Sequence, residues 1–392
     1  MKICAVISEF NPFHNGHKYL IDAIKKQGFT HIIAIMSGNF VERGEPAIVS
    51  KESRSKAAIL NGIDLVIEMP TVKVLNSAEK YATSAIEIAK KLGCVDGVAF
   101  GSECGNIQKL TKTIDILESK EFKNILKKYI SLGNSYPKSE YLALKEVTDN
   151  EDILDTLKSP NNILGIEYLR ALKKLKSSIE PITIKRNSDF LSSTEIRNLI
   201  LNKNDSYKNY VPKASAQILE KEITQGFLSV LENADKAMLY SLKTTHISDI
   251  LKISDVSEGL ENRIIECASA SSSVCELLKK IKTKRYTMAR IKRILLLIFL
   301  KITKNMQNKK IPYIKILGTN KKGLEILKKA KKTSELPIVS RLQEIKKLGK
   351  KATDFFESEC NISELYRFFT PNIKISENEK SFKIIKGEEI DL

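Results

Sequence analysis

The stretch Phe10-Asn11-Pro12-Phe13-His14-Asn15-Gly16-His17 decides the fold of this chain. It follows an apolar run at residues 3–7 and precedes an amphipathic run at residues 18–26. This order predicts a strand, a tight turn and a helix. A helix that begins directly after such a turn presents free backbone N–H groups and the positive end of its dipole, which suits a phosphate.

Two histidines three residues apart open the predicted helix. His14 and His17 share one side of its first turn, where both rings can donate hydrogen bonds to a phosphate. Gly16 between them lets that phosphate approach the backbone. Two surface histidines in a loop are the alternative, and the strand before the motif and the helix after it disfavour that interpretation.

Strand-like and helix-like segments alternate along the first hundred residues. The strand-like segments are 2–8, 31–36, 64–68 and 95–100, and the helix-like segments are 17–26, 50–61 and 77–92, with Ser50 as a predicted N-cap. The alternation predicts an α/β fold with a Rossmann-like, doubly wound parallel sheet. Because ligands of such sheets bind at the carboxyl ends of the strands, the turns after each strand form the candidate pocket.

Two common nucleotide-binding motifs are absent. The chain contains neither G-x-G-x-x-G nor G-x-x-x-x-G-K-S/T, which argues against a dinucleotide enzyme and against a P-loop ATPase.

A second candidate phosphate contact lies at residues 191–197 (LSSTEIR), where hydroxyls stand at a predicted helix start. Thr194 and Arg197 can hold a phosphate from the side opposite the two histidines. Alternatively, the hydroxyls are only N-caps and the arginine is a surface cation. Upstream, a β-type run at 181–186 ends in two cations, the second of which is Arg186.

The chain divides into two predicted domains. With 392 residues it is long enough for two, and the polar stretch 204–213 predicts a boundary between an α/β domain at 1–205 and a mostly helical domain at 206–392. Segment 279–351 carries 24 lysines and arginines against three acids, whereas the whole chain has a net charge of +18. A basic segment on a near-neutral body favours a nucleic-acid partner, and solvated lysine-rich helices are the alternative.

Four cations surround one aromatic residue within this segment. Lys282, Lys284, Arg285 and Arg290 flank Tyr286, just before the most apolar run of the chain. Cations that neutralise phosphates, beside a ring on which a loop base can stack, suit RNA.

Several classes of protein and site are disfavoured. The most apolar run, 294–300, is too short to cross a bilayer, and the N-terminus does not read as a signal peptide. The six cysteines show no C-x-x-C spacing, and the four histidines complete no zinc pattern. We therefore expect a cytoplasmic chain with reduced thiols, no membrane association and no protein-held metal, while the oligomeric state stays open.

The strand–turn–helix with H-x-G-H, together with the later S-S-T-x-I-R, resembles the nucleotidyltransferase superfamily, whose members hold ATP on a Rossmann-like sheet and react at its α-phosphate. Further motifs resemble one family within it, the bacterial tRNA-Met cytidine acetate ligases. They are 37–47 (SGNFVERGEPA), 62–70 (GIDLVIEMP), 77–79 (SAE), 100–103 (FGSE), 160–166 (PNNILGI), 258–263 (EGLENR), 282–286 (KTKRY) and 313–318 (YIKILG). The resemblance extends to about residue 320.

The resemblance implies a nucleotidyltransferase-type ATP-binding catalytic domain at 1–205 and a helical tRNA-binding domain at 206–392. It implies that ATP and acetate give acetyl-adenylate and pyrophosphate, with Mg²⁺ as an expected cofactor. The exocyclic amine of the wobble cytidine of elongator tRNA-Met then takes the acetyl group, giving N4-acetylcytidine and AMP.

The ATP-site residues follow from the same resemblance, with Thr194 and Arg197 added from the argument above, and the tRNA residues are the four cations of the basic segment. The ATP set is Ile7, Ser8, Glu9, Phe10, Asn11, Pro12, Phe13, His14, Asn15, Gly16, His17, Lys18, Tyr19, Leu20, Gly101, Asn162, Arg186, Thr194 and Arg197, and the tRNA set is Lys282, Lys284, Arg285 and Arg290. His14 and His17 are the expected catalytic residues. Arg43, Lys51 and Arg54 are further candidate cations, with surface salt bridges as the alternative. Ser193 stands where alanine is expected, a change that spares the Thr194 hydroxyl.

Other functions remain open from the sequence. One is transfer of a nucleotidyl group to a small-molecule phosphate, although such enzymes are usually shorter and lack a basic helical domain. Another is a non-catalytic RNA-binding protein with a relic nucleotide site, which the intact H-x-G-H disfavours. An aminoacyl-tRNA synthetase is disfavoured because the chain has no K-M-S-K-S-like motif.

Overall fold

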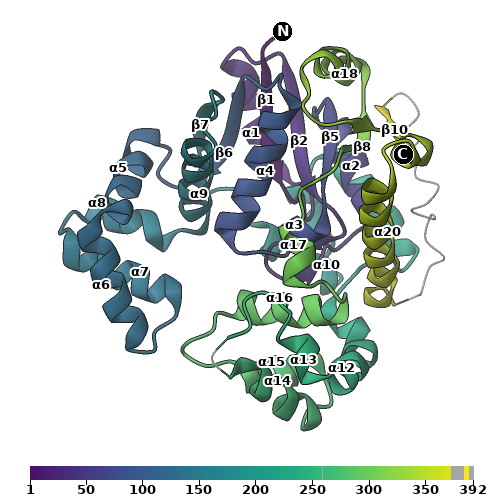
Figure 1. Ribbon diagram of the computed structural model, residues 1–392. Coiled ribbons are helices and arrows are strands. Elements are labelled where there is room, and N and C mark those ends of the chain that lie inside the picture. Colours follow the sequence, from purple (N-terminus) through teal and green to yellow (C-terminus); the bar gives the residue numbers. More distant parts are fainter. Residues whose placement is uncertain (258, 372–383, 388–392) are drawn as a thin grey trace.

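An eight-stranded, mostly parallel sheet organises the computed structural model, which describes residues 1–257, 259–371 and 384–387 (Figure 1). In spatial order its strands are β10 (Ile385–Lys386), β8 (Ile314–Thr319), β5 (Leu65–Met69), β2 (His31–Ser37), β1 (Ile3–Ser8), β6 (Gly97–Ser102) and β7 (Glu180–Lys185), and β9 (Ile338–Val339) pairs with β8. Strands β3 (Phe40–Val41) and β4 (Glu45–Pro46) form a separate antiparallel hairpin. Glu258 of the motif at 258–263, and residues 372–383 and 388–392 of the predicted second domain, lie outside the described residues.

Strand β1 lies inside the sheet because it is apolar on both faces. Its Ile3 and Ala5 side chains belong to the core on one face, and Cys4 and Val6 belong to the core on the other. A strand that is covered on both faces has a continuous run of apolar residues, and such a run is the pattern from which β1 was predicted. The α/β prediction is therefore confirmed.

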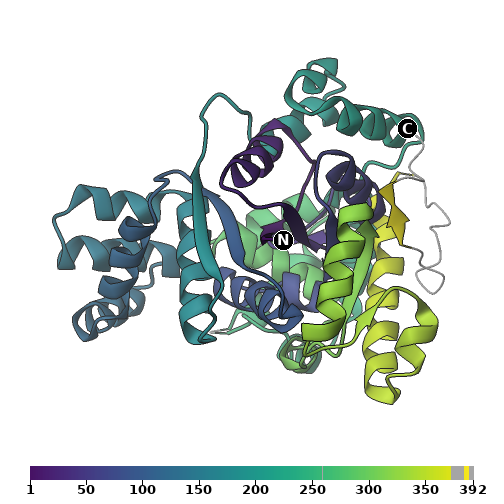
Figure 2. The same ribbon diagram turned by 90° about the horizontal axis from the view of Figure 1, so that it is seen from above.

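Helices cover both faces of this sheet (Figure 2). Apart from the lobe described next, the helices of the first half are α1 (Asn15–Lys26), α2 (Lys51–Leu60), α3 (Thr71–Val74), α4 (Ala78–Leu92), α9 (Pro160–Lys174) and α10 (Ser193–Leu201). The predicted N-cap at Ser50 is confirmed, because its hydroxyl accepts the Ser53 N–H at 3.2 Å. Such a cap satisfies one of the free N–H groups at the helix start.

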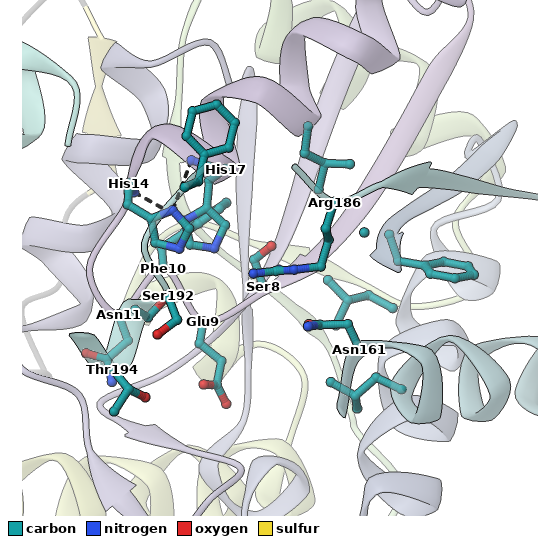
Figure 3. Close-up of a pocket in the computed structure, with 18 of the residues that line it drawn as sticks. Ser8, Glu9, Phe10, Asn11, His14, His17, Asn161, Arg186, Ser192 and Thr194 are labelled. Atoms are coloured by element: carbon teal, nitrogen blue, oxygen red, sulfur yellow. Dashed lines mark hydrogen bonds between the residues drawn. The ribbon is translucent and has the colours of Figure 1, made fainter. Parts of the chain in front are cut away.

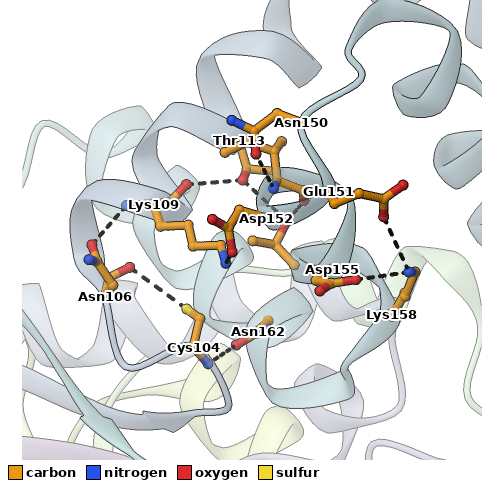
Figure 4. A network of polar contacts seen from close by, with 12 residues as sticks. Cys104, Asn106, Lys109, Thr113, Asn150, Glu151, Asp152, Asp155, Lys158 and Asn162 are labelled. Atoms are coloured by element: carbon orange, nitrogen blue, oxygen red, sulfur yellow. Dashed lines mark hydrogen bonds and ion pairs between the residues drawn. The ribbon is translucent and has the colours of Figure 1, made fainter.

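A small helical lobe projects beside β7, at the left of Figure 1. It consists of α5 (Ile107–Glu118), α6 (Lys120–Ser131), α7 (Tyr136–Val147) and α8 (Glu151–Leu154), followed by a 3-10 turn at Asp155–Lys158. Figure 4 shows its polar ties: Lys109 pairs with Asp152 at 2.8 Å, and the Cys104 N–H donates to Asn162 Oδ1 at 3.1 Å. The lobe is thus fixed to the sheet through the start of α9.

The second half is mostly helical, as predicted. Its helices are α11 (Lys213–Thr224), α12 (Asp235–Thr244), α13 (Ile247–Ile250), α14 (Leu260–Ser269), α15 (Val274–Ile281), α16 (Met288–Phe299), α17 (Lys304–Asn308), α18 (Lys321–Thr333), α19 (Leu342–Lys346) and α20 (Lys350–Leu365), with 3-10 turns at Asp205–Tyr210, Leu231–Ala234 and Tyr366–Phe369. The apolar run 294–300 is buried in a core of its own, formed largely by α12, α14, α15, α16 and α20. Within the described residues, no helix is both long and apolar enough to span a membrane.

The structure departs from a purely helical second domain in one respect. Strands β8, β9 and β10 come from this half of the chain, and β8 joins the main sheet antiparallel to β5. Lys315 of β8 lies 2.9 Å from Glu68 of β5, and both side chains are buried. The predicted division at 205/206 therefore does not separate two independent cores, because the chain returns to the first one.

The basic segment 279–351 is also divided in space. Lys322, at the start of α18, donates to the Thr30 carbonyl just before β2, and Thr333, at its end, donates to the Leu92 carbonyl at the end of α4. The lysine-rich helix α18 thus lies at the amino ends of the parallel strands, near the N-terminus in Figure 1. Only the earlier part, with α16, faces the carboxyl ends, where ligands of such sheets bind.

Candidate active site

A cavity opens at the carboxyl ends of β1 and β6, where the winding of the sheet reverses direction (Figure 3). Beyond β1 the chain builds β2 and β5 on one side, and β6 and β7 lie on the other. This is the position at which doubly wound sheets bind ligands. The lining includes Ile7, Ser8, Glu9, Phe10, Asn11, His14, Gly16, His17, Tyr19, Leu20, Val41, Glu42, Arg43, Glu45, Gly101, Asn161, Arg186, Thr194 and Arg197.

The two histidines form a capping box at the start of α1. His14 Nδ1 accepts the Gly16 N–H at 3.0 Å, and His17 Nδ1 accepts the His14 N–H at 3.2 Å. Their rings lie 3.8 Å apart, centre to centre, with an angle of 33° between the planes. Since both Nδ1 atoms act as acceptors, the proton of each neutral ring is on Nε2, which remains as a donor.

Both imidazoles are neutral at physiological pH. Burial, reinforced by the Arg186 cation, lowers the pKa of His14 to about 4. Burial also holds the pKa of His17 well below its usual value, with further lowering by His14 and Arg186. A neutral pair at a helix start offers two hydrogen-bond donors to an anion without the repulsion of two imidazolium charges.

The turn before the histidines is held from the opposite side by α10. Arg197 Nη1 donates to the Asn11 carbonyl at 2.9 Å, and its Nη2 donates to Thr194 Oγ1 at 3.2 Å. Phe10 in this turn has a φ of 47°, a left-handed conformation that costs a non-glycine residue free energy. The contacts of Arg197 and the burial of the Phe10 ring hold the turn in place.

The β3–β4 hairpin forms a second wall and connects the cavity to α16. Its Glu42 lies 3.0 Å from Arg293, and its Glu45 pairs with Lys292. Gly44, at the tip, has a φ of 77°, and a Cβ there would collide with the backbone of α16. A glycine is therefore needed for the hairpin to lie directly against the basic helix.

The third wall comes from β6, β7 and α9. The backbone N–H of Arg186 donates to the Ser102 carbonyl at 2.9 Å, and a Cβ on Gly101 would lie 3.3 Å from the Arg186 side chain. Asn161 Nδ2 donates to Glu103 Oε1 at 2.6 Å, and the Asn162 N–H donates to Glu103 Oε2 at 3.0 Å. This wall is polar and open, next to the apolar rings of Phe100 and Tyr168 that also line the cavity.

Comparisons with known proteins agree with this geometry. The family model of the HIGH Nucleotidyl Transferase matches residues 1–381. The chain is 41% identical to the tRNA(Met) cytidine acetate ligase of Caldanaerobacter subterraneus subsp. tengcongensis, over 98% of this chain and 100% of that protein. It is 38% identical to the one from Clostridium kluyveri, over 98% of this chain and 99% of that protein. This chain belongs to the tRNA(Met) cytidine acetate ligase family.

The fold of this family member also matches a solved structure. Thermotoga maritima TmcAL bound with alpha-thio ATP superposes with a TM-score of 0.92 at 32% identity, covering 98% of this chain and 100% of that chain. Its apo form gives a TM-score of 0.91. The family and the nucleotidyltransferase-type fold predicted from the sequence are confirmed.

Most of the predicted ATP residues of this tRNA(Met) cytidine acetate ligase family member line the same cavity, and five do not. Lys18 pairs with Asp22 at 2.6 Å on the exposed side of α1, and Asn15 donates to the Asn209 carbonyl. Pro12 and Phe13 are buried beneath the turn. Asn162 is buried and holds Cys104, while its neighbour Asn161 lines the cavity. The prediction at 162 thus fell one residue from the side chain that lines the cavity.

Two of the three further candidate cations are buried, so the surface salt-bridge alternative is wrong for them. Arg54 donates to the carbonyls of Glu9 and Ser37, at the ends of β1 and β2, and Lys51 lies 2.6 Å from Glu68. Arg43 is exposed and lines the cavity. Glu42 and Glu45 were not singled out from the sequence, although they stand in the motif 37–47, because their role depends on a helix some 250 residues away.

The four residues predicted to bind tRNA fall into two groups, exposed and hydrogen-bonded within the protein. Lys282, Lys284 and Arg285 are exposed on the loop before α16. Arg290 instead donates to the Asp255 carbonyl at 2.6 Å, and its guanidinium lies 5.1 Å from the Tyr286 ring centre. Tyr286 is itself buried, so the expected base-stacking ring is not available on this surface. Arg290 and Tyr286 stabilise the loop that carries the three exposed cations.

Proposed function

We propose that this chain is an ATP-dependent ligase that acetylates N4 of the wobble cytidine of elongator tRNA-Met. ATP and acetate give acetyl-adenylate and pyrophosphate, and the cytidine amine then takes the acetyl group and releases AMP. The observation that supports the proposal most directly is the pair of neutral histidines at a helix start. They lie in a cavity at the point where the winding of the sheet reverses direction. The relatives that match this chain over nearly its full length are named for this activity.

The first step needs donors at the α-phosphate. In-line attack by acetate concentrates charge on the non-bridging oxygens and expels pyrophosphate. Donors already fixed in place stabilise that charge without reorganisation. His14 and His17 supply two Nε2–H groups, while their Nδ1 atoms accept the Gly16 and His14 N–H groups and so fix the two rings at the start of α1. In our proposal the α-phosphate lies there, and Thr194 with Arg197 contacts the departing pyrophosphate from α10.

The adenosine then lies along the third wall. Gly101 leaves room beside Arg186, and Asn161 and Phe100 complete that side of the cavity. The solved relative bound with alpha-thio ATP supports a nucleotide in this fold. On this arrangement, acetate and the cytidine enter from the opposite side, next to the β3–β4 hairpin and the exposed side chain of Arg43.

The tRNA in our proposal approaches along α16. The exposed cations Lys282, Lys284 and Arg285 lie just before this helix, whose Lys292 and Arg293 contact the cavity wall. Because a wobble base stands in a single-stranded loop, it can leave its stack and enter a pocket. The location of the substrate tRNA leads us to place the activity in the cytoplasm, where the six free thiols are stable.

Mg²⁺ fits this site only as a companion of the nucleotide. Within the described residues, no group of three His, Cys, Asp or Glu side chains could hold a metal ion. Mg²⁺ is commonly held by substrate phosphates with few protein ligands, and it would supply further charge stabilisation at the triphosphate. We assign none of this chain's residues to it.

The proposal is tested by incubating the purified protein with ATP, labelled acetate and total tRNA, followed by nucleoside analysis. Labelled N4-acetylcytidine in elongator tRNA-Met is the expected product. If the folded protein gives no acetylated cytidine, the proposal is wrong. Pyrophosphate release that requires a phosphorylated small molecule instead of acetate would point to the simpler nucleotidyltransferase reaction.

A further inference from the structure

Three carboxylates line a cavity that has to bind two anions, ATP and acetate. They are Glu9 after β1, and Glu42 and Glu45 on the β3–β4 hairpin. Glu42 is paired with Arg293, and Glu45 is paired with Lys292 and lies 3.8 Å from Arg197. Among the described residues, no cation lies within 4.0 Å of the Glu9 carboxylate. Glu9 is thus the carboxylate of this cavity that a structural ion pair does not explain.

The position of the Glu9 side chain is fixed. Its Oε1 accepts the backbone N–H of Glu42 at 2.8 Å, and the Arg54 guanidinium donates to the Glu9 carbonyl at 2.6 Å. Oε2 has no hydrogen-bond partner among the described residues. Figure 3 shows the carboxylate extending into the cavity from the end of β1, below the two histidine rings. One oxygen therefore orients the group, and the other faces the space where substrates would meet.

The second chemical step needs a proton acceptor. When the cytidine amine attacks the acetyl carbon, its nitrogen becomes positively charged and has to lose a proton before the intermediate can collapse to product. The histidines are poor candidates, because each Nδ1 already accepts a backbone N–H and each Nε2 already carries a proton. Arg43, Arg186 and Arg197 are cations and cannot accept a proton. A carboxylate is the remaining choice.

We propose that Glu9 is the general base of the acetyl-transfer step. This inference rests on the proposed function. The N4 lone pair forms a bond to the acetyl carbon while the carbonyl π electrons move to oxygen. Glu9 Oε2 takes one proton from the N4 nitrogen; the oxyanion then re-forms the carbonyl and breaks the bond from the acetyl carbon to the phosphate oxygen. AMP leaves, and the Glu9 carboxylic acid releases its proton to water.

The surroundings of Glu9 suit this role. Burial raises its pKa above the usual value, and the Glu42 N–H and three arginines oppose that rise. The ionisable groups that face it are Arg43 and Glu42 on the hairpin, Arg54 on α2, Arg197 on α10, Tyr81 on α4 and Tyr168 on α9. A carboxylate whose pKa is raised is, in its ionised form, a stronger base than an exposed glutamate.

The test measures adenylate formation and acetyl transfer separately in the Glu9→Gln variant. The amide oxygen of glutamine still accepts the Glu42 N–H, but the side chain can no longer take a proton. Because Glu9 lines the ATP cavity, acetate-dependent ATP–pyrophosphate exchange serves as the reference half-reaction, and we expect it to fall far less than the transfer step. Transfer from preformed acetyl-adenylate to tRNA should slow by at least about 100-fold in single turnover. The wild-type transfer rate should fall as the pH is lowered, and that dependence should be absent in the variant.

The controls keep a negative result informative. Glu357→Gln changes an exposed glutamate of α20 and should leave both half-reactions unchanged. Glu9→Asp keeps a carboxylate, so it should transfer the acetyl group faster than Glu9→Gln. This comparison separates loss of the base from a folding defect caused by changing residue 9. Wild-type transfer rates in Glu9→Gln, equal loss of both half-reactions, or a changed Mg²⁺ requirement for exchange would each overturn the inference. If the wild-type protein itself makes no acetylcytidine, the proposed function fails instead.

Discussion

Arg197 Nη1 donates a hydrogen bond to the backbone carbonyl of Asn11 at 2.9 Å, across 186 residues of sequence. The contact joins the middle of α10 to the turn that precedes the histidine pair. It holds that turn in the conformation in which Phe10 has a positive φ. One guanidinium therefore links two parts of the cavity wall that are far apart in the sequence.

The first prediction concerns this contact. A hydrogen bond to a charged group contributes roughly 1.5–3 kcal/mol, so Arg197→Gln should weaken ATP binding by about 10- to 100-fold. Arg341→Gln, which removes an exposed cation whose Nε lies 3.9 Å from Glu344, is the matched control and should bind ATP normally. Equilibrium binding of ATP to both variants provides the measurement. Equal affinities of the two variants for ATP would show that Arg197 does not contribute to ATP binding.

The second prediction concerns the histidine pair. His14→Asn and His17→Asn remove the Nε2–H donors, while asparagine at position 14 is still a good N-cap. Each change should lower acetate-dependent pyrophosphate exchange by about 100- to 1,000-fold and leave tRNA binding intact. His246→Asn alters another histidine N-cap, at the start of α13, and should exchange at the wild-type rate. Loss of tRNA binding in the first two variants would indicate a structural role instead.

The third prediction is a dependence of stability on pH. Burial lowers the pKa of His14 to about 4 in the folded chain, against 6.5 for the ordinary side chain. Below pH 6.5 the unfolded state therefore binds a proton that the folded state does not, and stability falls by about 1.4 kcal/mol for each pH unit. Between pH 7 and pH 5, the wild type should lose about 2 kcal/mol more than His14→Asn in urea unfolding. Parallel losses in the two proteins would contradict the assignment of a neutral, buried His14.

Local patterns were enough to predict the elements that carry the site. The strand, turn and α1 follow from a change of period at Phe10 to His17, and the Ser50 cap follows from one residue. Thr194 and Arg197 were expected opposite the histidines, and they line the same cavity. The elements could be predicted because each depends on residues close together in the sequence, whereas the expected position of Thr194 and Arg197 came from the chemistry of a phosphate site.

Features that depend on distant partners could not be predicted in this way. Lys315 interrupts the apolar run of β8, and its charge is compensated by Glu68, 247 positions earlier, so the segment did not read as a strand of the main sheet. The hairpin glutamates acquire their partners from α16. The high density of charge along the sequence also placed α18 in the predicted RNA-binding segment. In the fold, however, this helix lies at the amino ends of the parallel strands, away from the cavity.

The fourth prediction uses that spatial division of the basic segment. Changing Lys282, Lys284 and Arg285 together to glutamine should weaken tRNA binding and reduce the slope of log affinity against log salt by roughly 2–3, because each lost phosphate contact contributes somewhat less than one. The matched triple change of Lys328, Lys331 and Lys332 on α18 removes the same charge at the amino ends of the strands and should have little effect. Salt titrations of tRNA binding distinguish the two triples. Equal slopes would show that binding follows net charge and not this loop.

The fifth prediction concerns the return of the chain to the sheet. Glu68 lies between Lys51 at 2.6 Å and Lys315 at 2.9 Å, and all three side chains are buried. Glu68→Gln leaves two buried cations without their shared carboxylate, and removing one partner of a buried ion pair typically costs about 3–5 kcal/mol. We expect a loss of that size in the free energy of unfolding measured with urea. Glu325→Gln, which removes an exposed carboxylate beside His31, should cost far less. A small loss for Glu68→Gln would mean that the lysines shed their protons or reach water, and that β8 is held to β5 by its backbone and apolar contacts alone.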